Sequence, residues 1–455
     1  MIPLQDQALR LERASYVLAL CFLVSILFIP YQTRWFNLAP QTGFLLLGST
    51  LSLVAFVIRV RWREVHLDWP LLLFAGALLG SIFYHQSFNV YSRAYVLSFA
   101  AYLWLRAALK YQNVTPLIWV SVFFILCNAA LLGAQIFIGD AWFVAKYFTN
   151  FDSFRTPLGF FDIPTTASMT PAIVILFLLS MQLQQKVKPA QVLNLTYFIA
   201  PFAVILAISR ATILSFFVAL TVAIFIYRRE FRYTWQPILL IVLGFVVPSL
   251  FLFNSQGILD ISNVFEFKIA RPVRGLVNIA TDILSGMLQP SSLDVVSAKD
   301  VVSAKQSLFD DSLRSRLVMW KHIALNMVSN TDLLWHGVGI GNSEEFFKRY
   351  LESGEYVRNL FGNNSVSPHN SYIEVFFEGG VFVGVALLVF VTTRIFGYGN
   401  WRSPWFISFI FLVIAMFFWD LLRMRYFWIV LALVEVYRDS PRSEANTLAT
   451  KKDRK

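Results

Sequence analysis

Long apolar runs, broken only by short charged or turn-rich segments, recur along almost the whole of this chain of 455 residues. An α-helix needs a run of about 20 apolar residues to cross a bilayer. Hydrophobic residues make up 57% of the sequence and charged residues only 14%, whereas soluble domains carry about 25% charged residues. The composition therefore excludes a soluble globular protein. We expect the bilayer itself to cover part of the apolar surface.

We place twelve membrane-spanning helices on these runs. They are expected near residues 14–30, 43–60, 70–84, 93–109, 116–138, 166–182, 191–208, 212–228, 235–254, 371–393, 404–420 and 426–437. The last run is short, so ten or eleven spans remain alternatives. The predicted fold is an all-α integral membrane protein. Its expected parts are helices 1–9 in residues 1–254, a large outer loop in 255–370, helices 10–12 in 371–437 and a basic tail in 438–455.

The basic residues are unevenly distributed over the loops. Those of the short loops fall mostly on the side that holds the N-terminus, as in the run Arg59, Arg61 and Arg63. Basic loops stay in the cytoplasm, so both termini are predicted to be cytoplasmic. The formal net charge of +11 therefore reflects membrane topology, and no nucleic-acid partner is expected. The tail 451–455 is expected to contact lipid headgroups.

Neither the cysteines nor the histidines predict a metal site. Cys21 and Cys127 both lie within apolar runs, and the sequence has no CxxC pair and no pair of histidines at ligand spacing. These patterns exclude a disulfide framework and a structural zinc site. We therefore expect no metal and no cofactor.

The outer loop 255–370 differs from the other connections, because it is too long to be a plain connector. The segment Ser312–Val328 has apolar residues at helical spacing, so the loop is expected to be partly helical. It carries Arg314 and Arg316, which would lie about 200° apart on a helix. Taken singly, either arginine is more simply a solubility charge.

Two basic side chains at the edges of spans have two interpretations each. Arg210 lies in a short turn between two apolar runs, where it is either a snorkelling anchor or a functional group. His369 directly precedes the run that begins near Tyr372, with Asn370 or Ser371 as the helix cap. Its imidazole is either part of a capping turn or a general base at the bilayer surface.

The glycine-rich run Gly337–Asn342 is not a dinucleotide fingerprint, since its spacing and its place in an outer loop are both wrong. We interpret it as a tight turn around Gly339 that leaves backbone N–H groups free for an anionic ligand.

Several motifs occur together in a fixed order. Arg155-Thr-Pro-Leu-Gly and Ser209-Arg210 are followed by Arg316-x-x-x-Trp320, then by the glycine run, then by Pro368-His369-Asn370-Ser371-Tyr372-Ile373-Glu374 and Glu378-Gly379-Gly380. In this order, over roughly residues 150–395, the sequence resembles the O-antigen ligase and polymerase superfamily. Each motif alone is weak, and the ordered set is fairly specific.

The resemblance implies a GT-C-like, mostly helical enzyme of the bacterial inner membrane with a periplasmic active site. Its donor would be a glycan on undecaprenyl diphosphate, and it would need neither a metal nor a nucleotide. The family's catalytic residues match Arg210, Arg316 and His369. In this interpretation the arginines stabilise the diphosphate and the histidine serves the acceptor hydroxyl. Substrate contacts are expected from Arg155, Arg314, Gly339, Asn370 and Tyr372.

The acceptor is left open by these motifs. A ligase passes the glycan to lipid A-core, a polymerase passes it to another lipid-linked glycan, and a protein O-oligosaccharyltransferase passes it to a side-chain hydroxyl. A single large outer loop before the histidine favours the ligase. A polysaccharide transporter or flippase is the alternative from a different class, but transporters usually place ionisable residues at mid-membrane. Here the functional-looking charges gather at one face, which favours interfacial chemistry.

Overall fold

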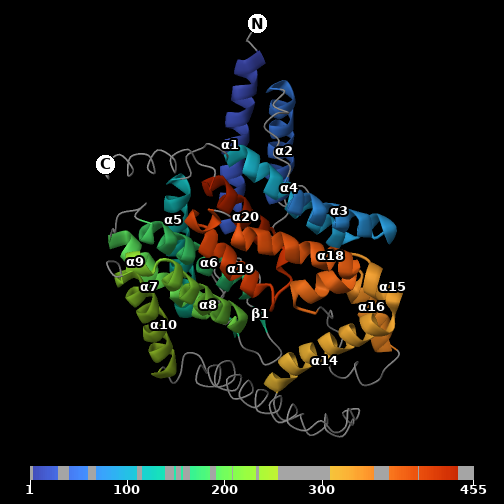
Figure 1. The fold of residues 1–455 in the computed structure, drawn as a ribbon. Coiled ribbons are helices and arrows are strands. Elements are labelled where there is room, and N and C mark those ends of the chain that lie inside the picture. The colour runs from blue at the N-terminus through green and yellow to red at the C-terminus, as the bar shows by residue number, and fades with distance from the viewer. Residues whose placement is uncertain are drawn as a thin grey trace.

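The structure is a computed structural model. It describes residues 4–28, 40–59, 68–109, 115–138, 148–149, 155–156, 164–184, 191–206, 209–231, 235–254, 308–352, 368–397 and 399–438. Nearly all of these residues are helical (Figure 1). The exceptions with regular structure are two two-residue strands, β1 (Phe148–Thr149) and β2 (Arg155–Thr156), which pair antiparallel. The predicted, mostly helical fold class is thus confirmed.

Each of the twelve predicted apolar runs lies on a helix. These are α1 (Leu4–Phe28), α2 (Pro40–Arg59), α3 (Trp69–Tyr84), α4 (Val90–Leu109), α5 (Thr115–Ile138), α6 (Pro164–Leu183), α7 (Gln191–Leu206), α8 (Arg210–Ile226), α10 (Gln236–Asn254), α18 (Ser371–Phe396), α19 (Phe406–Ala415) and α20 (Arg425–Arg438). A four-residue helix, α9 (Arg228–Phe231), and the 3-10 turns η5 (Asn400–Arg402) and η6 (Leu421–Arg423) connect some of them.

Not all of these helices have the length of a membrane span. Within the described residues, α6 and α18 contain stretches long and apolar enough to cross a bilayer, and seven further helices contain shorter apolar stretches. One of the short helices is α19, which ends at Ala415 although the apolar run continues to residue 420. The positions of the helices agree with the sequence, and their arrangement as twelve spans stays a prediction.

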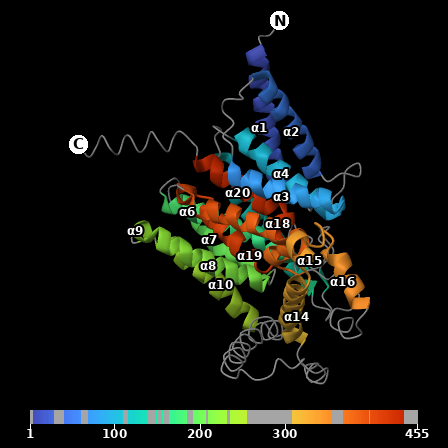
Figure 2. The ribbon, with the colours of Figure 1, turned by 45° about the vertical axis from the view of Figure 1, so that its right-hand side comes forward.

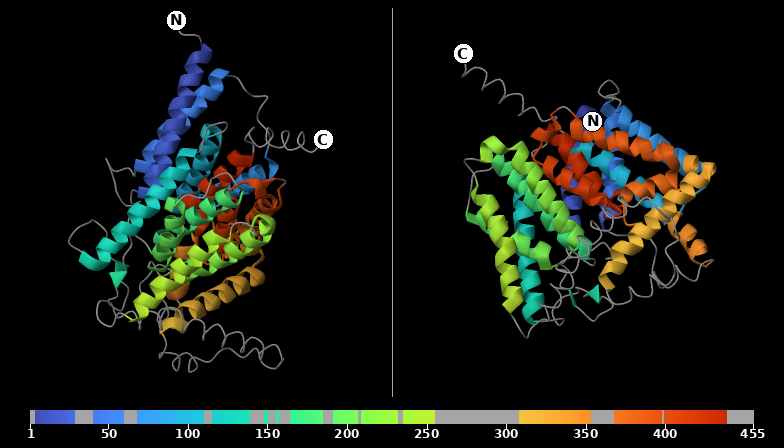
Figure 3. Two further views of the ribbon diagram at one scale, coloured as in Figure 1. Left: turned by 90° about the vertical axis from the view of Figure 1, so that its left-hand side faces the viewer. Right: turned by 60° about the horizontal axis from the view of Figure 1, so that its bottom comes forward.

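The core surrounds α6, whose side chains from Ala167 to Leu183 are almost all buried. A helix that is apolar on every side is buried on every side. Helices α7, α8 and α19 pack around it, and the Trp405 ring at the start of α19 stacks on Phe177 of α6 at 3.7 Å between centroids. By contrast, α1 and α2 lie side by side as a hairpin that projects from the bundle (Figures 1 and 3).

The longest of the C-terminal helices, α18, is broken in its N-terminal half. Gly380 has φ +72° and ψ −175°, which interrupts the helix. The turn after α15 (Thr331–His336) fills this break: the N–H groups of Val338 and Gly339 donate to the carbonyl oxygens of Phe377 and Glu378 at 3.0 and 2.8 Å. The broken helix therefore recovers its hydrogen bonds from the large loop.

Three helices of the large loop lie together next to this break. They are α14 (Leu308–Ser329), α15 and α16 (Ser343–Glu352), and they lie at the end of the molecule away from the N-terminus (Figure 2). The predicted helical segment 312–328 falls within α14, so the loop is partly helical as expected. Its segments 255–307 and 353–367, and the tail after residue 438, lie outside the described residues.

The opposite end of α18 is held by a buried ionic cluster. Arg394 is paired with Asp68 and, at 2.9 Å, with Glu435. Arg106 contacts Glu435 at 3.0 Å, and the Tyr102 hydroxyl donates to the same carboxylate at 2.7 Å. Glu435 is fully buried, so these partners are needed to compensate its lost hydration. The cluster joins α18 to α3, α4 and α20.

The break in α18 predicts that a single methyl group added at Gly380 lowers the stability of the protein. A Cβ added at Gly380 would lie 2.1 Å from the carbonyl oxygen of Trp335, in a backbone conformation that L-residues avoid. We expect Gly380→Ala to lower the melting temperature of the purified protein clearly, and Gly76→Ala on α3, where a Cβ meets nothing within 4 Å, to leave it almost unchanged. Equal melting temperatures for the two variants would contradict this account of the break.

Candidate active site

The turn that carries His369 is fastened to its surroundings on both sides. Before it, the Trp320 indole donates to the carbonyl oxygen of Pro368 at 2.8 Å. After it, the Ser371 N–H donates to the carbonyl oxygen of Met416 at 2.8 Å, and the Ser371 hydroxyl donates to that of Trp419 at 2.7 Å. His369 itself has φ +48°, a left-handed conformation that a non-glycine residue keeps only when its environment imposes it.

Asn370 is the cap of α18. Its side-chain oxygen accepts from the N–H groups of Tyr372 and Ile373 at 3.0 and 3.1 Å, as the sequence predicts for one of the two candidate caps. The Tyr372 hydroxyl donates to the carbonyl oxygen of Val413 on α19 at 3.0 Å. The side chains of Asn370 and Tyr372 thus fix the start of α18, and their expected substrate contacts stay proposals.

The imidazole of His369 lies among Asp420, Trp419 and Arg316. Its Nδ1 is 3.8 Å from Asp420 Oδ2, and its ring centroid is 6.1 Å from that of Trp419. The guanidinium carbon of Arg316, which comes from α14, lies 5.8 Å from the Trp419 ring. The structure therefore brings Arg316 and His369 together against one tryptophan, although 53 positions separate them in the sequence.

The charge state of His369 follows from these neighbours. Burial lowers the pKa of His369 below its ordinary value of 6.5, the Asp420 carboxylate raises it, and Arg316 lowers it. Burial also lowers the pKa of Arg316, against the effect of Asp420, but an arginine remains charged at neutral pH. The site thus combines a neutral imidazole, which can accept a proton, with a fixed cation, which can stabilise an anion.

Three of the expected residues have described backbones and undescribed side chains. Arg210 is the first residue of α8, which Ser209 caps. Arg155 lies in β2, and Arg314 lies in α14 two residues before Arg316. The contacts of these three side chains lie outside the described residues, so their roles stay proposals.

The expectation for the glycine run is wrong at Gly339. Its N–H was predicted to be free for an anionic ligand, but it donates to Glu378 at the break of α18. A Cβ at Gly339 would lie 2.9 Å from the His85 side chain, and one at Gly341 would lie 2.4 Å from that of Asn89. The run consists of glycines because the turn is packed closely against α18 and the α3–α4 connection.

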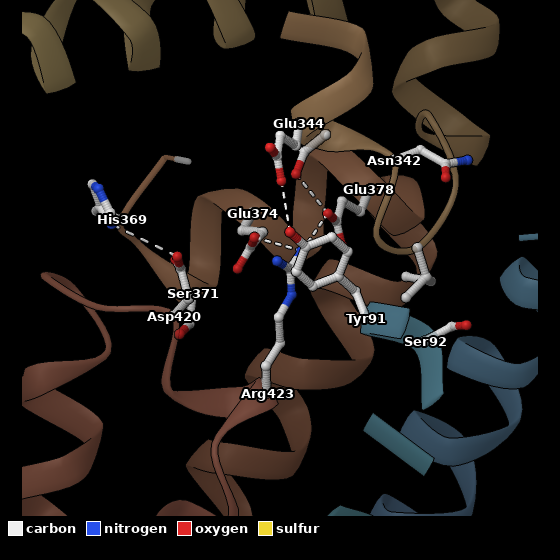
Figure 4. Close-up of polar contacts among 12 residues, drawn as sticks. Tyr91, Ser92, Asn342, Glu344, His369, Ser371, Glu374, Glu378, Asp420 and Arg423 are labelled. Carbon is white, nitrogen blue, oxygen red and sulfur yellow. Dashed lines mark hydrogen bonds and ion pairs between the residues drawn. The ribbon is translucent and has the colours of Figure 1, made fainter. Parts of the chain in front are cut away.

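An acidic and basic cluster next to His369 is the main feature that the sequence did not reveal. Arg423 of η6 extends between two glutamates of α18, with its Nη2 2.6 Å from Glu374 Oε1 and 2.5 Å from Glu378 Oε1 (Figure 4). Its guanidinium carbon is 4.4 Å from the Tyr91 ring. Glu374 also interacts electrostatically with Asp420. The pKa of Arg423 is raised, because the attraction of the two glutamates outweighs burial, which lowers it.

The same cluster joins the large loop to the membrane helices. The Ser343 hydroxyl at the start of α16 donates to Glu378 Oε1 at 2.7 Å, and the Tyr91 hydroxyl on α4 donates to Glu344 at 2.6 Å (Figure 4). A signal for the cluster was available in the sequence: Glu374 and Glu378 are one helical turn apart, and Asp420 and Arg423 interrupt two apolar runs. Their convergence depends on tertiary structure and could not be read from spacing.

Within the described part of the chain, no three histidine, cysteine, aspartate or glutamate side chains are grouped so that they could hold a metal ion.

A family model described as O-antigen ligase matches residues 195–389. This range runs from α7 into α18 and includes Arg210, Arg316, His369, Glu374 and Glu378. It ends before Asp420 and Arg423. No curated protein matches the chain.

The neighbours of His369 predict opposite effects of two substitutions on its titration. Arg316→Gln removes a nearby cation and should raise the midpoint, whereas Asp420→Asn removes a nearby anion and should lower it, each by roughly 1 pH unit or less. Histidine ¹³C NMR of the detergent-solubilised protein would measure both. Lys321→Gln, an exposed change on the same helix as Arg316, serves as control. A midpoint unaffected by Arg316→Gln would contradict the contact.

Proposed function

We propose that the chain, whose residues 195–389 match a family model described as O-antigen ligase, is a membrane glycosyltransferase of surface polysaccharide synthesis. It takes a glycan from an undecaprenyl diphosphate carrier and passes it to a hydroxyl of lipid A-core. The observation that carries the proposal is the shared site of His369 and Arg316 against Trp419 and Asp420. The match supports ligase or polymerase chemistry. The undecaprenyl diphosphate donor and the lipid A-core acceptor are part of our proposal.

The reaction needs two contributions from the protein: a cation that stabilises the leaving diphosphate, and a base that accepts the proton of the acceptor hydroxyl. The bond between the anomeric carbon and the diphosphate oxygen breaks, and its electron pair leaves with the lipid diphosphate. Arg316 provides a permanently charged guanidinium that matches phosphate oxygens. We assign Arg210 the same task, because it stands at the N-terminal end of α8, where the helix dipole also favours an anion.

The second requirement is a base for the acceptor. As the new bond forms between the acceptor oxygen and the anomeric carbon, the hydroxyl proton passes to the imidazole of His369. Nδ1 faces Asp420, which directs Nε2 towards the acceptor and stabilises the imidazolium that forms. Arg155 and Arg314 are proposed to contact the glycan or its diphosphate.

We place this site at the periplasmic face of the inner membrane, with both termini in the cytoplasm. Helices α14 to α16 lie away from the N-terminus (Figures 1 and 2), and the basic loops favour a cytoplasmic N-terminus. The ligase is preferred to the polymerase because one large outer segment directly precedes His369. Carrier-linked glycans are also available at this face without any nucleotide.

Replacing His369 separates the candidate functions. We expect His369→Ala to slow transfer by about 10²- to 10⁴-fold. In a ligase, full-length glycan then accumulates on the carrier while lipid A-core stays uncapped. In a polymerase, the core instead carries single repeats. Gel analysis of lipopolysaccharide and of carrier-linked glycan measures both.

The matched control is His336→Ala, which removes an outer histidine that pairs with Asp332 of its own helix at 2.8 Å. It should leave both profiles unchanged. A well-expressed His369→Ala strain with normal lipopolysaccharide and normal carrier-linked glycan would reject both enzymatic functions and favour a transporter.

The proposed chemistry uses only protein side chains, so we expect transfer to survive chelation. Purified protein in lipid nanodiscs, supplied with carrier-linked glycan and acceptor, should retain its rate in EDTA and without nucleotide. A loss of activity in EDTA that a divalent cation restores would show that the diphosphate is stabilised by a metal rather than by the arginines alone.

A further inference from the structure

Exposed tryptophans gather at one side of the helical bundle. Five tryptophan side chains are exposed among the described residues. Trp69 is the first residue of α3, Trp119 lies near the start of α5, Trp235 directly precedes α10, and Trp401 lies in η5, whereas Trp335 lies on α15. Exposed tryptophans of membrane proteins concentrate at the level of the lipid headgroups, because the ring is apolar and its N–H is polar.

Hydrogen bonds and ion pairs hold several of these helix ends together. Arg394 near the end of α18 pairs with Asp68, which caps the start of α3. The Asn400 side chain donates to the carbonyl oxygen of Arg394 at 2.7 Å, and the Tyr227 hydroxyl at the end of α8 donates to that of Trp401 at 3.1 Å. The ends of α8 and α18, the start of α3 and η5 therefore form one side of the bundle.

The remaining two tryptophans follow helices that end at this side. Trp235 lies nine positions after the end of α8. Trp119 lies ten positions after the end of α4, whose Arg106 belongs to the ionic cluster around Glu435. The candidate active site belongs to the other ends of the same helices, since α8 starts at Arg210 and α18 starts directly after His369.

The connection between α8 and α10 adds exposed positive charge to this side. Arg228 and Arg229 of α9 are both exposed. The Arg228 guanidinium carbon lies 5.9 Å from the centroid of the Phe225 ring, which is 73% exposed, and Trp235 at the far end of the connection is 60% exposed. The segment 228–232 contains three arginines and one glutamate, so its charge is positive.

An anionic phospholipid fits this combination better than a soluble anion does. Its phosphate would be attracted by the two guanidinium groups, whose alkyl stems can lie along apolar surface. The exposed rings of Phe225 and Trp235 would then enter the boundary of the acyl chains, as the apolar face of an interfacial segment does. A soluble anion would leave both rings in water.

We propose that this side of the bundle lies in the headgroup layer of the membrane leaflet away from the candidate site, and that Arg228 and Arg229 bind anionic phospholipids there. Phe225 and Trp235 mark the boundary between the headgroups and the acyl chains. This lipid contact is independent of the proposed glycosyl transfer, because no residue of the candidate active site takes part in it.

Quenching of Trp235 fluorescence by brominated lipids measures which lipid lies at this place. Full-length protein is inserted into phosphatidylcholine nanodiscs that contain the same fraction of either brominated phosphatidylglycerol or brominated phosphatidylcholine, with the bromine atoms close to the headgroup. The contribution of Trp235 is the difference between the unaltered protein and its Trp235→Phe variant. We expect the anionic lipid to quench Trp235 more strongly than the zwitterionic one, because the arginines enrich it locally.

Replacing both arginines, as Arg228→Gln with Arg229→Gln, should remove this preference. Each arginine near an anionic surface contributes about five-fold to lipid binding, so the two together contribute roughly 25-fold. The matched control is Arg10→Gln with Arg13→Gln, an exposed pair on α1. It removes the same charge at another place and should leave the quenching of Trp235 unchanged.

Two results on the unaltered protein would overturn the proposal: equal quenching of Trp235 by the two brominated lipids, and no quenching by either. A preference that persists in the double variant would reject Arg228 and Arg229 as its source. A preference that excess inorganic phosphate abolishes at constant ionic strength would assign the arginines to a soluble anion instead. None of these results depends on transfer activity, so failure here and failure of the proposed function are distinguishable.

Discussion

The need to satisfy backbone hydrogen bonds away from water determines how the part of this molecule around the break in α18 is built. Where α18 breaks at Gly380, the carbonyl groups of Phe377 and Glu378 lose their helical donors, and the N–H groups of Val338 and Gly339 replace them. This exchange fixes the large loop to α18, which begins just after His369. Helices α14 and α15 precede the turn of Val338 and Gly339, and α16 follows it. The same two hydrogen bonds therefore bring Arg316, Ser343 and Glu344 to the site.

The sequence predicts the helices of this fold well, since hydrophobic length and charged breaks are local properties. All twelve apolar runs coincide with helices, and the capping role of Asn370 follows from its place before the run. The early end of α19 could not be foreseen, because it depends on the Met416 carbonyl oxygen accepting from Ser371. The role of the glycine run was misjudged for a similar reason: glycine signals close approach, and the sequence does not say whether a ligand or a helix approaches.

Some residues of the candidate site could likewise be predicted from the sequence, and others could not. Arg316 and His369 were identified from ordered motifs, and the structure places both against Trp419. The predicted spans put Asp420 at the end of an apolar run and Arg423 in the connection to the next run. The importance of Arg423 arises from its ion pairs with Glu374 and Glu378, which lie 45 or more positions away in sequence. Long-range ion pairs of this kind leave no periodic trace in a single sequence.

The ionic cluster of Arg394, Asp68, Arg106 and Glu435 has a mechanical consequence for α18. One end of this helix is tied down by Ser371, whose N–H and hydroxyl donate to the carbonyl oxygens of Met416 and Trp419, and the other by buried ion pairs of Arg394 with Asp68 and Glu435. A transporter that alternates between two openings must let at least one such element pivot. Here a pivot at the Arg394 end would separate these buried charges, and each isolated ion is strongly disfavoured away from water. We therefore expect α18 to stay fixed, and the carrier-linked donor of the proposed function to reach the site by diffusion within the plane of the membrane.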